Sequence, residues 1–166
     1  MTEDSPSPIR PTDDDARDMA QTLIRQARIA SLAVLNPESG APHVTRVAFG
    51  LGMEGQWLTL VSDLSFHTKA LRSTPQIGLL LGEAPTKGDP LAFPRLSAQA
   101  APEFVARESK DHAFHREAWL THHPKSALYV DFADFSFVEF TPISADLNGG
   151  FGKAYNLTAQ DMRLST

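Results

Sequence analysis

Turn signals recur at short intervals along this chain, and they divide its apolar residues into short runs. Asn-Pro-Glu-Ser-Gly at 36–40, Met-Glu-Gly-Gln at 53–56 and Gly-Asp-Pro at 88–90 are such signals. The runs beside them have the length of β-strands and cover residues 30–35, 42–51, 57–61 and 77–81. Short strands joined by tight turns form antiparallel sheets, whereas parallel strands need a helical crossover. The pattern therefore predicts a mainly β fold, an antiparallel barrel with peripheral α-helices.

The remaining elements are three predicted helices and further strands. Asp13, Asp14 and Asp15 favour the positive end of a helix dipole, so a first helix is expected to begin there. A second helix follows Ser65. A third covers 109–122, with Phe114, Ala118 and His122 expected along its buried stripe. Further strands are predicted at 91–99, 134–140 and 142–147, whereas 127–132 has no clear preference.

Length and composition limit the architecture and the class of partner. The 166 residues suit a single domain at 12–166, and the Pro-rich segment 1–11 is predicted to be a disordered tail. A net charge of -5 argues against nucleic acid as a partner. The chain has no cysteine, no secretory signal and no apolar run long enough to cross a bilayer. We therefore expect a cytoplasmic protein without membrane contact.

The segment VSDLSFHTKAL, at 61–71, carries the clearest chemical signal. It passes from a strand into a helix through Ser62, Ser65, His67, Thr68 and Lys69. Hydroxyls, an imidazole and an ammonium group at the start of a helix are suited to binding a phosphate monoester. The alternative is an ordinary helix cap, in which the Ser65 side chain binds the Thr68 N–H group.

Arg46 is the second candidate, because a long cation is unusual in the middle of a strand. Strand alternation places Val44 and Arg46 on one face and Thr45 and Val47 on the other. Arg46 could extend its planar guanidinium toward a phosphate or a ring carbonyl. The alternative is a surface arginine on a half-solvated strand.

Three weaker signals lie in the second half of the chain. His112, His115 and His122 could share one side of a helix and bind a metal or haem, although solvated or packed histidines are the simpler interpretation. The glycines at 149–152 allow either close approach to a flat ligand or an ordinary turn. Trp119 could stack on an aromatic ligand or belong to the core or an interface.

Several of these motifs together resemble a known family. The chain is similar to the pyridoxamine 5'-phosphate oxidase-like FMN-binding split barrels, and specifically to their haem-utilisation branch. The resemblance covers about residues 14–157 and rests on the order of HVTRVAF, SDLSFHTKAL, GDPLAFPRL, HPKSALYVDFADFSFVEFTP and GGFGKA. An imidazole, His67, stands where many relatives have lysine, as is usual in the haem-associated branch.

This resemblance implies a six-stranded antiparallel split barrel that forms a homodimer with FMN at the subunit interface. Arg46 and Val47 would line the flavin, and Arg95 and Trp119 would be weaker contacts from the partner subunit. The implied phosphate grip consists of residues in the turn after the third strand: Ser62, Ser65, His67, Thr68 and Lys69.

The expected function is that of a flavoprotein, an FMN-dependent oxidoreductase acting on an unknown small-molecule substrate. The flavin would carry the electrons, so no catalytic residue and no metal ligand is assigned. The alternative is a haem-binding or haem-utilisation protein without flavin chemistry. Haem-processing relatives have a further C-terminal region with a haem-ligating histidine, and this sequence ends at Thr166. The resemblance therefore favours FMN over haem.

Overall fold

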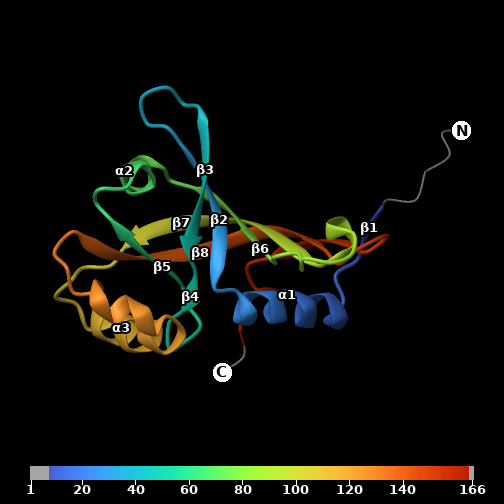
Figure 1. Cartoon of the computed structure of the whole chain (residues 1–166). Helices are drawn as coiled ribbons and strands as arrows, with labels where there is room; N and C mark the ends of the chain where they lie inside the picture. Colours follow the sequence, from blue (N-terminus) through green and yellow to red (C-terminus); the bar gives the residue numbers. More distant parts are fainter. Residues whose placement is uncertain (1–7, 165–166) are drawn as a thin grey trace, which may run out of the picture.

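A computed structural model of the chain describes residues 8–164 and contains one large β-sheet with helices on both sides (Figure 1). Its strands are β1 (Ile9–Arg10), β2 (Ile29–Leu35), β3 (Pro42–Ala48), β4 (Gly50–Leu51), β5 (Trp57–Ser62), β6 (Ile77–Leu81), β7 (Arg95–Phe104), β8 (Phe135–Asn148) and β9 (Ala154–Thr158). Its helices are α1 (Asp14–Gln26), α2 (Phe66–Ser73) and α3 (Lys110–His122), with short 3-10 turns at Pro90–Ala92 and Pro124–Leu128.

The sheet has the order β1-β9-β8-β7-β6-β2-β3, with β5 paired to β8 and β4 paired to β5. Every pairing is antiparallel except that of β1 with β9. Within the described part of the chain no ladder joins β3 to β5, so the sheet curls without closing. The predicted mainly β class with peripheral helices is confirmed.

The predicted count of six strands is wrong, because nine strands occur within residues 8–164. The two strands expected at 134–140 and 142–147 form one continuous strand, β8. Pro142 is tolerated because it lies where β8 changes its neighbour from β5 to β9, opposite a bulge at Gln99/Ala100. Neither β5 nor β9 pairs with β8 at this point, so the missing N–H group of Pro142 breaks no ladder with them.

Two short strands near the ends of the chain, β1 and β9, are not indicated by the sequence pattern. The segment 1–11 was expected to be disordered. Residues 1–7 lie outside the described residues, whereas Ile9–Arg10 pair with the start of β9.

No helix within residues 8–164 combines the length and the apolar character that crossing a membrane requires.

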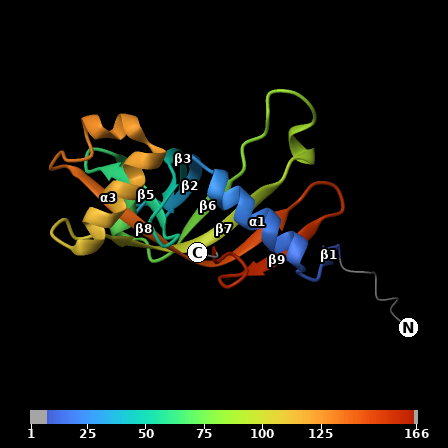
Figure 2. The same cartoon turned by 90° about the horizontal axis from the view of Figure 1, so that it is seen from below.

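The main core lies inside the curled sheet, and α1 covers it. Ala16, Ala20 and Ile24 form the fully buried face of α1, which lies against β7 (Figure 2). Small side chains at the first two of these positions allow the helix to approach the strands closely. They belong to the same buried cluster as Leu32 and Leu96, which are 0% exposed. The barrel interior is therefore filled by side chains.

The first helix depends on its N-cap, as the run of aspartates predicts. The Asp13 carboxylate accepts a hydrogen bond from the Ala16 N–H group at 2.9 Å. We expect Asp13→Ala to lower the free energy of unfolding by about 1 kcal/mol, because it leaves a helix N–H without an acceptor. Urea denaturation measures this change. Asp15→Ala is the matched control, because Asp15 is exposed in the same turn and is not the N-cap. Equal effects of the two substitutions would contradict the capping role.

A second, smaller core separates α3 from the sheet and consists of Leu58, Trp119, Val130 and Phe137. The predicted buried stripe of α3 is wrong: Phe114 is 52% exposed, and the buried helix residues are His112, His115 and Trp119. The reason is Phe137 on β8, whose ring lies 5.3, 6.4 and 5.8 Å from these three rings. Packing on Phe137 therefore determines which face of α3 is buried.

Candidate functional site

Two hydroxyls of the predicted phosphate turn have structural roles. Ser62 ends β5, and its Oγ donates to the Asp134 carboxylate at 2.7 Å and accepts the Leu64 N–H at 3.2 Å. Thr68 is 1% exposed, and its Oγ1 donates to the Ser62 carbonyl at 2.6 Å. These bonds fix the path of the chain from β5 into α2. Ser62 and Thr68 therefore shape the turn and have already donated their hydroxyl hydrogens within the protein.

The other three side chains of the turn remain available. Ser65 is the N-cap residue of α2, but its side chain makes no cap hydrogen bond. The Thr68 N–H instead meets the Ser65 backbone carbonyl at 3.1 Å, so the side-chain cap of the alternative interpretation is not formed. His67 is half-buried. Lys69 lies 3.6 Å from Glu38, and both side chains are largely exposed, so this ion pair contributes little. The edge of α2 thus presents a hydroxyl, an imidazole and an ammonium group.

His67 has a pKa below the ordinary value of 6.5, first because it is partly buried and second because His43 lies nearby. The His43 ring itself packs edge-on against Phe66, with 4.7 Å between ring centroids. The lowered pKa favours the neutral imidazole in the free protein. A bound anion would favour its protonated form and would gain a charge-assisted hydrogen bond.

This lowered pKa predicts a pH dependence of stability. Unfolding releases His67 to its ordinary pKa of 6.5, so between that value and the lower native pKa the unfolded chain binds more protons. The free energy of unfolding should therefore fall as pH drops below about 6.5. We expect the fall in Tm between pH 7.5 and 5.5 to be smaller in His67→Gln than in the wild type. An identical fall in both proteins would exclude a contribution from His67.

Arg46 lies on β3 with its side chain exposed, opposite Ser31 on β2. Within residues 8–164 the structure gives its guanidinium no hydrogen bond and no ion pair. The end of β3 lies beside β5, because the Thr59 hydroxyl donates to the Ala48 carbonyl at 2.7 Å. Gly50 of β4 pairs with Leu58 of β5.

The faces of β3 are as the alternation predicts. Val47 is 6% exposed and belongs to the core, whereas Arg46 faces outward. Any contact of Val47 with a ligand on the outer face would therefore involve its backbone. We call four candidate residues, three on α2 and one on β3, the α2 cradle: Ser65, His67, Lys69 and Arg46. The ring contact between α2 and β3 joins Phe66 to His43, which lies on the opposite face of β3 from Arg46.

Arg95 lies far from the α2 cradle within one chain. Its guanidinium donates to the Leu91 carbonyl at 3.1 Å, and its backbone pairs with Asn148 at the end of β8. Ser62 pairs with Phe135 at the other end of β8. The strand between these ends spans about 43 Å. Arg95 can join the cradle only from a second copy of the chain.

Trp119 is part of the second core and is 0% exposed. Its indole N–H donates to Ser126 Oγ at 3.1 Å, and its ring packs on His123 with 4.3 Å between centroids. The buried indole is what the core interpretation of Trp119 predicts, and the flavin contact stays a prediction. The sequence left open whether this residue is a ligand contact or part of the core, and the structure places it in the core.

The three candidate haem or metal histidines are not brought together as ligands. His112 and His115 are 9% and 2% exposed and pack on Phe137, whereas His122 is only partly buried. Within the residues that the structure describes, no group of three His, Cys, Asp or Glu side chains could hold a metal ion. The glycines at 149–152 form the β8–β9 turn, where Gly150 and Gly152 have positive φ angles of 106° and 70°.

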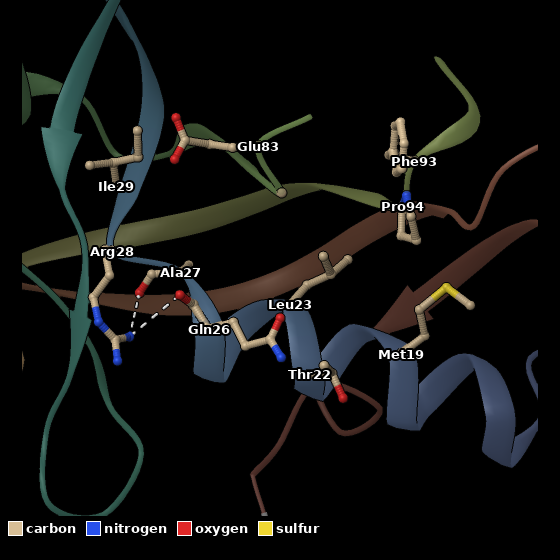
Figure 3. A pocket seen from close by; sticks show the side chains of 11 residues that line it. Met19, Thr22, Leu23, Gln26, Ala27, Arg28, Ile29, Glu83, Phe93 and Pro94 are labelled. Atoms are coloured by element: carbon tan, nitrogen blue, oxygen red, sulfur yellow. Dashed lines mark hydrogen bonds between the residues drawn. The ribbon is translucent and has the colours of Figure 1, made fainter. Parts of the chain in front are cut away.

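Sequence reasoning misses Asp134 and a cavity beside α1. Asp134 is 72 residues from Ser62 in the chain, so no local pattern predicts their hydrogen bond. The cavity, of about 620 Å³, lies between α1 and the segments around Gly82 and Pro94, and Leu23, Ile29, Glu83 and Phe93 contribute to its walls (Figure 3). No residue of the α2 cradle lines it.

Comparison with known proteins gives two relatives whose names refer to heme. The chloroplastic non-canonical heme oxygenase HOZ of Arabidopsis thaliana is 36% identical over 103 residues, which are 62% of this chain and 30% of that protein. The structure of a heme binding protein from Mycobacterium smegmatis is 26% identical with a TM-score of 0.81, over 93% of this chain and 61% of that one. This chain thus spans less than a third of the plant relative.

A third relative shows the fold alone. It is a protein of the pyridoxinephosphate oxidase family from Clostridium acetobutylicum, 15% identical with a TM-score of 0.66, and the match covers 91% of this chain and 99% of that one. The predicted resemblance to the pyridoxamine phosphate oxidase-like split barrels and their haem-utilisation branch is confirmed. Residues 11–162 match the family described as CREG, beta-barrel. The chain therefore belongs to the CREG beta-barrel family.

Proposed function

We propose that the chain is an FMN-binding flavoprotein whose α2 cradle holds the cofactor phosphate. The observation that carries this proposal is the set of uncommitted polar groups at the start of α2. Ser65 makes no cap bond, and Lys69 has only a loose, exposed ion pair. A phosphate monoester carries a charge close to −2, so it needs several such donors to replace its water shell. The N–H groups in the first turn of α2 add to them.

The electrostatic surroundings fit an anion. Asp63 is the carboxylate within the turn, and Arg72 binds it at 2.8 Å, which reduces its repulsion. Asp134 is engaged by the Ser62 hydroxyl. Arg46 adds a planar, permanently charged group on the neighbouring strand. Arg46 and Lys69 are thus the cations offered to the phosphate, and Glu38 and Asp134 are the neighbouring carboxylates besides Asp63.

The cofactor would supply electron and hydride transfer when bound, and the protein would bind and orient it. Arg46 would contact the phosphate or the ring edge, while the outer face of β3 would support the ring. We propose an oxidoreductase of this kind acting on a small molecule. No side chain is assigned to the reacting atoms.

We also propose a homodimer, because Arg95 and the cradle lie at opposite ends of β8 in one chain. Supporting this, the outer face of the sheet exposes Val44 and Leu80, by 64% and 42%, around the small residues Ser31 and Gly78. Exposed apolar residues on a flat face are typical of interfaces.

A charged residue at the centre of this face should separate the subunits. We expect Leu80→Arg to convert a species of twice 18.1 kDa into a monomer, because an unpaired cation would be buried in the interface. Size-exclusion chromatography with light scattering measures the mass. Leu128→Arg is the control, since Leu128 is 78% exposed elsewhere. A wild-type monomer would contradict the dimer.

The experiment that tests the flavoprotein is an absorption and fluorescence titration with FMN. We expect a yellow protein, or an apoprotein that takes up FMN and quenches or shifts its fluorescence. A colourless protein that binds no added FMN would overturn the proposal.

Haem binding is the second candidate function, and the named relatives favour it: a heme oxygenase and a heme binding protein. The buried His112 and His115 are poor candidates for the axial ligand, whereas His43 and His67 are more accessible. A haem titration run beside the FMN titration separates the two functions. A Soret shift without FMN binding would select haem, and the absence of a shift would exclude it.

A further inference from the structure

The turn between β5 and α2 is held from outside by the segment that leads into β8. Asp134, the residue before β8, meets this turn at two of its atoms. Its backbone carbonyl accepts the Asp63 N–H at 2.8 Å, and its carboxylate accepts the Ser62 hydroxyl at 2.7 Å. Because one residue makes both bonds, the direction of its side chain relative to the turn is fixed.

Ser62 passes this constraint on to the residues that follow it. Its hydroxyl gives its hydrogen to Asp134, which leaves the oxygen to accept the Leu64 N–H at 3.2 Å. Its carbonyl accepts the Ser65 N–H at 3.0 Å and the Thr68 hydroxyl at 2.6 Å. The path from β5 into α2 is therefore set by hydrogen bonds that converge on Ser62.

This path leaves donors free at the start of α2. Within residues 8–164, the backbone N–H groups of Phe66 and His67 make no hydrogen bond, and the Ser65 side chain makes no cap bond. These are groups that the proposed phosphate site would use. Hydrogen bonds weaken steeply when donor and acceptor are misaligned, so the shape of the turn should decide how well these groups bind an anion.

The segment before β8 is itself fastened to the rest of the molecule by two arginines. Arg107 donates to the carbonyls of Asp131, Phe132 and Phe135, the first at 3.3 Å and the last at 3.1 Å. Arg116 on α3 binds the Asp131 carboxylate through two N–H groups, at 2.8 and 2.6 Å. Bidentate contacts of this kind fix geometry as well as adding energy. The segment can therefore act as a rigid support for the turn.

The charge of Asp134 is opposite to what an anion site needs. A carboxylate beside a phosphate repels it, so by charge alone Asp134 would weaken phosphate binding. Its hydrogen bonds give it a different effect. We propose that Asp134 is a positioning residue of the phosphate site, which acts through the Ser62 hydroxyl to hold the turn in its binding shape. This inference rests on the proposed binding of FMN at the α2 cradle.

Two substitutions of Asp134 separate positioning from charge. Asp134→Ala removes the charge and the acceptor, whereas Asp134→Asn removes the charge and keeps an oxygen that accepts the Ser62 hydroxyl. In fluorescence titrations we expect Asp134→Ala to raise the Kd for FMN by about fivefold or more, the effect of one lost hydrogen bond. Asp134→Asn should bind FMN at least as tightly as the wild type. An alanine variant that also binds FMN at least as tightly as the wild type would overturn the proposal.

The control for loss of a carboxylate is Glu83→Ala, which removes an exposed acid beside α1 and should leave the Kd for FMN unchanged. Riboflavin, which lacks the phosphate, should bind the wild type and Asp134→Ala equally well. An equal loss of riboflavin and FMN affinity in Asp134→Ala would show a general disturbance of the fold and would contradict a role at the phosphate.

A double-mutant cycle tests whether Asp134 acts through Ser62. Ser62→Ala removes the same hydrogen bond from the other side, so it should weaken FMN binding to a similar degree. The combined variant should lose little more than either single variant, because residues that share one interaction are not additive. Fully additive losses would mean that Asp134 acts by another route and would overturn the proposed mechanism.

Amide hydrogen exchange measures the turn in the absence of any ligand. The Leu64 N–H, which the Ser62 hydroxyl accepts, should exchange faster in Asp134→Ala and at the wild-type rate in Asp134→Asn. Unchanged exchange in Asp134→Ala would overturn the positioning role while leaving FMN binding intact. A wild-type chain that binds no FMN would overturn the proposed function, and the positioning role with it.

Discussion

Replacing Trp119 with alanine is expected to lower the free energy of unfolding by about 3–5 kcal/mol. The side chain is 0% exposed and packs on Phe137 with 5.8 Å between ring centroids. Its loss would leave a cavity between α3 and the sheet and would remove the donor that Ser126 accepts at 3.1 Å. Urea denaturation followed by circular dichroism measures the change.

The matched control is Phe151→Ala, which removes an aromatic residue that is 81% exposed at the β8–β9 turn. Its effect should stay within about 0.5 kcal/mol. Trp119→Phe should recover most of the lost stability, because it refills much of the volume. If Trp119→Ala kept its stability and lost only ligand binding, the assignment of Trp119 to the core would be wrong.

Removing the two basic side chains of the α2 edge should strongly weaken FMN binding. We expect His67→Ala combined with Lys69→Ala to raise the Kd for FMN at least tenfold, which is about 1.4 kcal/mol or more. The reason is the loss of two side chains that would donate to the phosphate in the proposed site; Lys69 has only a loose ion pair with Glu38 in the free chain. Fluorescence titration gives the Kd.

Riboflavin, which lacks the phosphate, makes this prediction specific. The double variant should bind riboflavin about as well as the wild type does, because the ring contacts are unchanged. Lys125→Ala removes an exposed cation outside the cradle and should leave the Kd for FMN unchanged. An equal loss of riboflavin affinity would mean that the substitutions disturb the fold or the ring site instead of the phosphate contact.

Local features of this fold were predictable from the residues. The Asn36 side chain accepts the N–H groups of Glu38 and Ser39, as turn chemistry at 36–40 implies. Alternation along β3 correctly separates the buried Val47 from the exposed Arg46. In each case the determining interaction lies within a few residues in the chain.

Features that depend on distant contacts were not predictable. Phe137 determines which face of α3 is buried, because His112 packs on its ring. Phe114, an apolar residue of the same helix, is on the exposed face. The continuity of β8 through Pro142 depends on which strands lie beside it. The polar residues of the turn before α2 were identified from sequence. The three-dimensional contacts were needed to show that the Ser62 and Thr68 hydroxyls bond within the protein, whereas the Ser65 side chain makes no cap bond.

The change of neighbour along β8 has a mechanical consequence. Its first half belongs with β5 and the α3 end of the molecule, and its second half belongs with β9 and the α1 end. Residues 141–143 pair with neither of these strands, and the strand on the other side carries its bulge at the same level. Among the described residues, the line at 141–143 is therefore held by β7 alone, whose pairing with β8 runs across it. Because β7 pairs with both halves of β8, a bend at this line would deform two strands together.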